Sequence, residues 1–178
     1  MSELDILKIV LERLNMLNIG YMLTGSVALN YYAQPRMTRD IDIVINIVKE
    51  DVTKIYSLFK EDFYIDKESV EDSIREKSSF NIIYFDFPMK FDFIVRKDTP
   101  YRLLEFDRRR KIEIEGVTAF IVSLEDLILS KLYWARDSHS QMQLDDVRLL
   151  LSGKNIDLKY IEDKAQELSL ASLLKELK

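Results

Sequence analysis

The chain has 178 residues, of which 47% are hydrophobic and 32% are charged, so it can bury one substantial core. It contains no cysteine, which excludes disulfides, thiolate zinc sites and cysteine nucleophiles. Its single histidine, His139, removes most histidine-based mechanisms, so any metal ion would need oxygen ligands. The formal net charge of -5 argues against a general nucleic-acid coat, although a local basic patch could still hold a strand or a nucleotide.

The first part of the chain predicts the order helix, strand, helix, strand. Residues 3–17 place leucine and valine at three- and four-residue spacing, which is the pattern of an amphipathic helix. Residues 21–24 are short and apolar and stop at a glycine, and residues 27–32 indicate a helix whose first turn is Gly25 and Ser26. In the second strand, at residues 40–45, every other residue is isoleucine, so one face of this strand is expected to pack inward.

The middle of the chain predicts a helix, a short strand and a hairpin. Residues 52–59 fit the helix and residues 63–65 the brief strand, whereas residues 67–77 are charged and give no clear pattern. Residues 79–85 and 89–95 are two β-rich stretches joined by a turn, which indicates an antiparallel hairpin.

The remainder predicts two more strands and then only helices. Pro100 suits a short helix start, and strands at residues 111–115 and 118–122 would turn at Gly116. Ser123, with Asp126 three residues later, is typical of a helix start. We therefore expect an α+β protein: residues 1–122 form an α/β core with a mixed sheet flanked by helices, and residues 123–178 form a helical extension packed on that core.

Three aspartates on the predicted strands suggest a cation site. Asp40 and Asp42 project from the non-isoleucine face of their strand, about 7 Å apart at the backbone, and can converge on one cation or a close pair. Asp92, on the second hairpin strand, points to the same side as Lys90 and Ile94. An all-oxygen trio suits Mg²⁺, which completes its coordination shell with water and phosphate. Taken alone, an Asp-x-Asp pair is more often a solvated strand face.

The turn before the second helix could hold the phosphate. Gly25 lets the backbone approach a ligand closely, helix N-terminal amides attract an anion, and Ser26 adds a hydroxyl donor. Arg36 and Thr38 have the same parity as Asp40, so they could bond phosphate oxygens if that strand begins early. These parts together match nucleotide handling.

The arrangement of Gly25-Ser26, Asp40-Ile41-Asp42 and the later Asp92 resembles the nucleotidyltransferase superfamily that includes DNA polymerase β. A narrower similarity, to bacterial AbiEii-type toxin nucleotidyltransferases and their uncharacterised relatives, rests on Arg36-x-Thr38, residues 124–127, Lys131 and Arg136-Asp137. The likeness covers roughly residues 20 to 150 and implies a nucleotidyltransferase-like core.

This resemblance implies a specific reaction. An acceptor hydroxyl would attack the α-phosphate of a nucleoside triphosphate such as ATP, two Mg²⁺ ions would be bound by Asp40, Asp42 and Asp92, and pyrophosphate would leave. Asp92 would be the base or metal ligand near the acceptor. Lys131, a cation on an apolar helix stripe, would reach the triphosphate, although extension past Leu127 to water is the more common arrangement for such a lysine.

The sequence does not identify the acceptor or the partners. The leading hypothesis is transfer to an RNA end or a protein, and a toxin with an antitoxin partner is one form of this hypothesis. The alternatives are transfer to a small molecule such as an aminoglycoside or lincosamide antibiotic, and a non-catalytic nucleotide-binding or protein-interaction module. The basic run at residues 108–111 could contact RNA, but compensation of a helix dipole is the more common role of such a run. We expect a cytoplasmic protein, since no signal peptide or apolar membrane-spanning stretch is present in the sequence.

Overall fold

The computed structural model describes residues 2–33 and 40–178, and it confirms an α+β protein built on a mixed sheet. The strands described are β1 (Gly20–Leu23), β2 (Asp40–Asn46), β3 (Phe63–Ile65), β4 (Ser79–Tyr84), β5 (Lys90–Val95), β6 (Arg110–Ile114) and β7 (Val117–Ile121). They form one sheet in the order β3-β4-β5-β2-β1-β7-β6.

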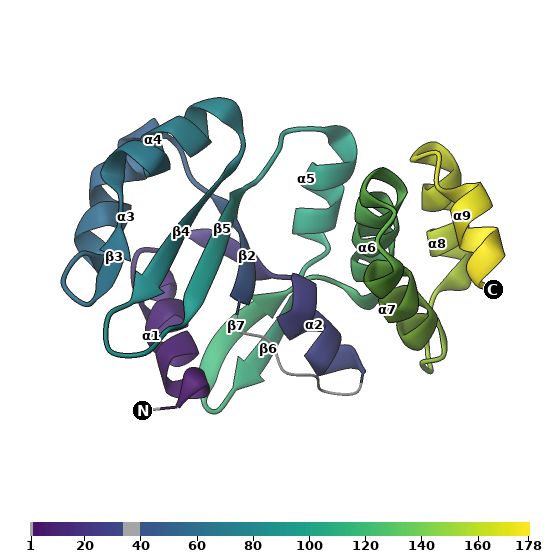
Figure 1. Cartoon of the computed structure of the whole chain (residues 1–178), viewed down its shortest axis with the longest axis horizontal. Coiled ribbons are helices and arrows are strands. Elements are labelled where there is room, and N and C mark those ends of the chain that lie inside the picture. The colour runs from purple at the N-terminus through teal and green to yellow at the C-terminus, as the bar shows by residue number, and fades with distance from the viewer. Residues whose placement is uncertain (1, 34–39) are drawn as a thin grey trace.

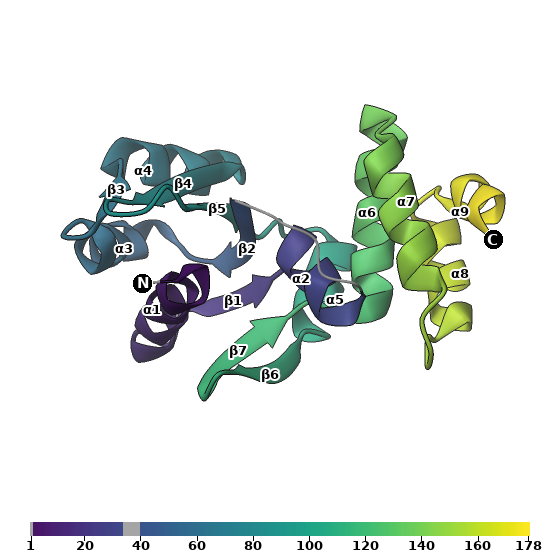
Figure 2. The same ribbon diagram turned by 60° about the horizontal axis from the view of Figure 1, so that its bottom comes forward.

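Helices surround this sheet and continue beyond it. They are α1 (Glu3–Met16), α2 (Gly25–Tyr32), α3 (Val52–Phe59), α4 (Lys67–Glu76), α5 (Pro100–Asp107), α6 (Leu124–Ser138), α7 (Gln141–Leu151), α8 (Leu158–Glu167) and α9 (Ala171–Leu177). Figures 1 and 2 both place α6 to α9 together at one end of the molecule, and α1, α3 and α4 toward the other. The helix α2 and the helix α5 lie between these two groups.

The centre of the sheet holds β2 between one antiparallel and one parallel neighbour. It runs antiparallel to β1 and parallel to β5, and the parallel register sets Asp42 beside Asp92 and Asp40 beside Lys90. Because side chains alternate along a strand, both aspartates of β2 share their face with Asp92 and Lys90. The predicted hairpin of β4 and β5 is confirmed as an antiparallel pair.

The opposite face of these strands carries the core. Ile43 and Ile45 of β2 and Phe91 and Phe93 of β5 are completely buried. Removal of this much apolar surface from water is the main driving force for the fold, at roughly 25 cal/mol per Å². The isoleucine alternation therefore fixes the direction of the acidic side chains, as the sequence predicts.

The charged stretch at residues 67–77 forms the helix α4, which the sequence pattern does not reveal. The side chain of Asp66 accepts a hydrogen bond from the backbone N–H of Ser69 and caps the helix. Val70 is fully buried, and α4 packs on α3 and β4. Its apolar stripe is so narrow that tertiary packing, not hydrophobic periodicity, decides the structure.

Within the described part of the chain, no helix combines the length and the apolar character that a bilayer crossing requires.

Candidate functional site

The three acids singled out by the sequence lie on one face of two adjacent strands. Asp40 and Asp42 come from β2 and Asp92 from β5, with Asp42 and Asp92 directly paired in register. Asp40 is the most exposed of them, at 56% of its side chain, and Asp92 is 28% exposed. Neighbouring strands lie about 4.8 Å apart, so these carboxylates interact through space.

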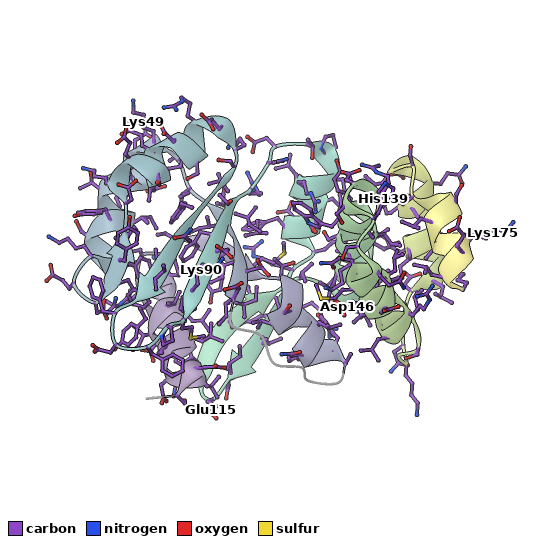
Figure 3. All side chains as sticks on the ribbon, viewed as in Figure 1. Lys49, Lys90, Glu115, His139, Asp146 and Lys175 are labelled. Carbon is purple, nitrogen blue, oxygen red and sulfur yellow. The ribbon has the colours of Figure 1, made fainter. Side chains whose placement is uncertain are left out.

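Lys90 stands among these carboxylates. Its Nζ lies 2.9 Å from Oδ2 of Asp92 and 3.7 Å from Oδ1 of Asp40. The hydrogen bond to Asp92 is the largest of the effects that raise the pKa of Lys90. Figure 3 marks Lys90 on β5, in the middle part of the sheet. The sequence places Lys90 on the same strand face as Asp92 but gives it no role.

Asp42 is a partly buried acid of the cluster. Burial is the largest cause of its raised pKa, and the negative charges of Asp92 and Asp40 raise this pKa further. Lys131 and Lys90 act in the opposite direction. An acid in this position gains most from an added cation, because a cation offsets both the burial and the like charges.

The turn between β1 and α2 lies directly against Asp42. The backbone N–H of Thr24 donates to the carbonyl oxygen of Asp42 at 3.0 Å. Gly25 has φ of +60°, and a Cβ atom at Gly25 would lie 2.0 Å from Oδ2 of Asp42. Only glycine allows the helix to begin this close to the carboxylate. Thr24 precedes α2 without a side-chain cap, and the helix N-terminus faces this acid.

A cavity of about 460 Å³ extends from this turn to the helices α5 and α6. The turn supplies Thr24, Gly25 and Ser26 to its wall, and β2 supplies Asp42. The residues that line the rest are Val44, Ile94, Val95, Arg96, Lys97, Arg102, Glu105, Leu127, Ser130, Lys131, Tyr133, Trp134, Asp137 and Gln143. The size is that of a site for a small organic molecule.

Lys131 lines this cavity from α6 and is buried, with 4% of its surface exposed. Its Nζ donates to Oδ2 of Asp146 at 2.8 Å and to Oε1 of Gln143 at 3.1 Å, both on α7. Figure 3 marks Asp146 on this helix. The alternative that Lys131 extends past Leu127 to water is therefore wrong.

Arg102 and Glu105 of α5 form a second charged group in the cavity wall. Nη1 of Arg102 bonds both carboxylate oxygens of Glu105, at 2.9 and 2.8 Å, and the hydroxyl of Ser130 at 2.8 Å. Burial raises the pKa of Glu105, although Arg102 and Ser130 act against it. Sequence reasoning misses this group because two charges three residues apart on a helix usually form a surface pair. Trp134, an exposed aromatic residue at the same cavity, is also missed, because no local sequence pattern places it there.

Two predicted phosphate-binding residues, Arg36 and Thr38, lie outside the described residues. Their roles stay predictions, as do the nucleotide and metal roles of the remaining site residues.

The first two residues of the basic run at 108–111 are engaged within the protein, whereas Arg110 and Lys111 are exposed. Nε of Arg108 donates to Asp126 at 2.9 Å, and Arg109 donates to the backbone carbonyl of Phe106 at 2.6 Å. The second contact satisfies an end carbonyl of α5, which favours the helix-dipole role over contact with RNA.

The chemistry of the three acids fits Mg²⁺, but their arrangement is not that of a completed metal site. In residues 2–33 and 40–178, no three acidic or histidine side chains are grouped closely enough to hold a metal ion. The donors are nonetheless all carboxylate oxygens, and Asp92 and Asp40 both lie near the ammonium group of Lys90. Carboxylate oxygens of this kind are the ligands that a hard divalent cation prefers.

No family model and no curated protein matches the sequence. Solved structures do match the fold. The antibiotic-resistance factor ANT(2'')-Ia in complex with adenylyl-2''-tobramycin gives a TM-score of 0.63 at 14% identity, covering 99% of this chain and 98% of that chain. An antigenic nucleotidyltransferase-like protein from Paracoccidioides brasiliensis gives 0.59 at 18% identity, over 94% and 90%. The lincosamide antibiotic adenylyltransferase LnuA, lincomycin-bound, gives 0.57 at 12% identity, over 85% and 98%. The chain thus has the fold of nucleotidyltransferases.

Proposed function

We propose that the chain is an Mg²⁺-dependent nucleotidyltransferase, which moves a nucleoside monophosphate from a nucleoside triphosphate to an acceptor hydroxyl and releases pyrophosphate. The observation that carries this proposal is the contact of the Gly25 turn with Asp42, beside Asp92. This contact places a helix N-terminus, which can bind phosphate, next to carboxylates, which can bind metal ions. Transfer from a nucleoside triphosphate requires both of these groups in one site.

The phosphate side of the reaction would be handled by the turn and by cations. Amides of Gly25 and Ser26 at the start of α2 would hold phosphate oxygens, with Arg36 and Thr38 adding donors. Lys131 would act from α6 as a point charge toward the triphosphate. Arg96 and Lys97 also line the cavity, which supports an anionic ligand there.

The acidic side would hold the metal ions and receive the acceptor. Asp40, Asp42 and Asp92 would bind two Mg²⁺ ions, which when bound stabilise charge on the phosphate and lower the pKa of the acceptor hydroxyl. Asp92 is the acid of β5 with an accessible carboxylate, so it is suited to accept the acceptor's proton.

The identity of the acceptor is the finer part of the proposal. Transfer to an RNA end or a protein, as a toxin of the AbiEii type with an antitoxin partner, follows from the sequence resemblance. An antibiotic acceptor is the second candidate, because the titles of two matching structures name adenylyl-2''-tobramycin and lincomycin. The presence of all three acids on one face of the sheet argues against a non-catalytic module.

One experiment tests activity and acceptor together. The protein is incubated with Mg²⁺ and each of four α-labelled nucleoside triphosphates, in separate reactions with total RNA, cell protein, an aminoglycoside and a lincosamide. We expect label in one acceptor pool, and Asp42→Asn to reduce the transfer by at least about 10²-fold.

Asp145→Asn is the matched control, because Asp145 is an exposed acid on α7 that pairs only with its own helix neighbours in the bonds seen here. Equal transfer by wild type and Asp42→Asn would rule out the proposed site. Growth inhibition that needs Asp42 would support the toxin hypothesis, whereas label in the antibiotic reactions alone would replace it.

A further inference from the structure

We propose that Lys90 is a built-in competitor of the divalent cation: its ammonium group holds Asp92 and Asp40 and must give way when Mg²⁺ binds. Lys90 thereby lowers the affinity of the protein for Mg²⁺, and in the metal-free protein it reduces the repulsion between the acids. This inference rests on the proposed function, since it concerns the same three acids.

The first support is the position of Lys90, which the backbone fixes. The parallel register places Lys90 beside Asp40, and strand alternation places it on the same face as Asp92 two residues later. The ammonium group consequently reaches two acids from different strands, at 2.9 and 3.7 Å. A lysine at most other positions of β5 could not do so.

The second support is the balance of charge. Among the described residues, Asp40, Asp42 and Asp92 share one strand face with Lys90. Like charges held this close repel each other and cost stability. Lys90 reduces that repulsion without cancelling it, so a divalent cation remains a better partner for the same oxygens.

The third support is that Lys90 can leave. Its side chain is 36% exposed, and the flexible lysine stem can move the ammonium into water at little cost. By comparison, the Lys131 side chain is 5% exposed and tied to α7, so it cannot be displaced in this way.

The test measures metal binding without nucleotide or acceptor. Mg²⁺ is titrated into wild type, Lys90→Met, Lys90→Arg and Lys54→Met by calorimetry, and thermal unfolding is recorded with and without Mg²⁺. Lys54 is a control of the same type, because it is an exposed lysine of α3 whose Nζ lies 3.2 Å from Oδ1 of Asp51, an acid outside the three-aspartate cluster.

We expect Lys90→Met to bind Mg²⁺ about tenfold more tightly, to unfold at a lower temperature without metal, and to gain more from added Mg²⁺ than wild type. Lys90→Arg, which keeps the charge, should stay near wild type, and Lys54→Met should bind Mg²⁺ as wild type does. A Kd of Lys90→Met within twofold of wild type, or no Mg²⁺ binding by either protein, would overturn the inference.

This outcome is separable from that of the transfer assay. If Lys90→Met tightens Mg²⁺ binding but no acceptor is ever labelled, the competition holds and the proposed reaction fails. If transfer occurs and metal binding is unaffected by Lys90→Met, the reaction stands and the competition is wrong.

Discussion

Beside the cavity, the sheet and the helices treat charge in opposite ways. The sheet wall is the polar face of β2 and β5, from which Asp42 lines the cavity, and the helical wall is the group α5 to α8. On the sheet wall, Asp40, Asp42 and Asp92 share one strand face with Lys90, and Asp40 and Asp92 remain partly exposed. On the helical wall, the buried charges are matched: Lys131 pairs with Asp146, and Arg102 pairs with Glu105. Like charges without enough counter-charge lower the stability of the fold but can bind a ligand of opposite charge. Buried charges that are paired with each other hold helices in place. The difference agrees with the proposal that the acids of the sheet wall carry out the transfer while the helical wall holds the fold around them.

Asp126 should give the largest effect on stability, because it is the centre of the helical wall's hydrogen bonds. Its carboxylate is fully buried and accepts from Tyr101 at 3.2 Å, Tyr160 at 2.8 Å, Arg108 at 2.9 Å and Ser123 at 2.6 Å. These partners join α5, α6 and α8. We expect Asp126→Ala to lower the free energy of unfolding by about 3–5 kcal/mol, since it leaves Arg108 without its buried partner. Urea denaturation measures this change.

The comparison for that variant is Asp145→Ala, on the exposed side of α7, where Asp145 pairs with Arg148 at 2.7 Å. Exposed pairs contribute about 0.2–1 kcal/mol, so the loss should be small. If both variants lost a similar free energy of unfolding, the buried, paired charge of Asp126 would be no more important for stability than an exposed ion pair.

Gly25→Ala should have the next largest effect. An added methyl group would meet the Asp42 carboxylate and would also require φ of +60° from an alanine. We expect a loss of about 1–3 kcal/mol in the free energy of unfolding, together with a loss of nucleotidyl transfer.

Gly116→Ala separates the two causes. Gly116 also has positive φ, at +84°, but a Cβ atom there would meet nothing within 4 Å. This variant should lose only the roughly 1–2 kcal/mol of a left-handed backbone and should retain transfer. Loss of transfer in both variants would mean that contact with Asp42 is not what makes Gly25 necessary.

Asp42→Asn should have the smallest effect and the opposite sign. The pKa of Asp42 is raised in the folded protein, so its ionised form destabilises the fold at neutral pH. This penalty is complete above the raised pKa and disappears as the pH falls below the ordinary value for an aspartate. In metal-free solution, we expect Asp42→Asn to be more stable than wild type by about 0.5–2 kcal/mol at pH 7.

The measurement is urea denaturation of both proteins in chelator across a pH series. The stability difference should shrink steadily on acidification, because wild-type Asp42 then becomes neutral. A difference that does not depend on pH, or a variant less stable than wild type at pH 7, would show that Asp42 does not carry the predicted repulsion.

Much of the sheet wall was predictable from sequence, because side chains alternate between the two faces of a strand. Alternation at β2 sets which way Asp40 and Asp42 point, and Gly25 marks the turn between a strand and a helix. The same strand parity places Asp92 on a polar face. The same alternation places Lys90 on the face of β5 that carries Asp92, but it does not say which neighbouring strand Lys90 contacts.

The helical wall was not predictable, because its contacts join residues far apart in the chain. Arg102 and Glu105 are three residues apart on α5, and no local pattern indicates that Ser130 of α6 packs against them. Asp126 was visible in the sequence only as part of a helix start, and its bonds to Tyr101 and Tyr160 appear only after α5 and α8 dock.

The sequence by itself therefore determined the order of the elements apart from α4, the α+β class and the faces on which the acids lie, since these follow from local periodicity and turn chemistry. Tertiary structure alone decided that β2 and β5 are parallel neighbours, which sets Asp92 beside Asp42 and Lys90 beside Asp40. It also decided that Lys131 is buried against α7. Register and helix docking depend on long-range packing, which no local pattern in the sequence encodes.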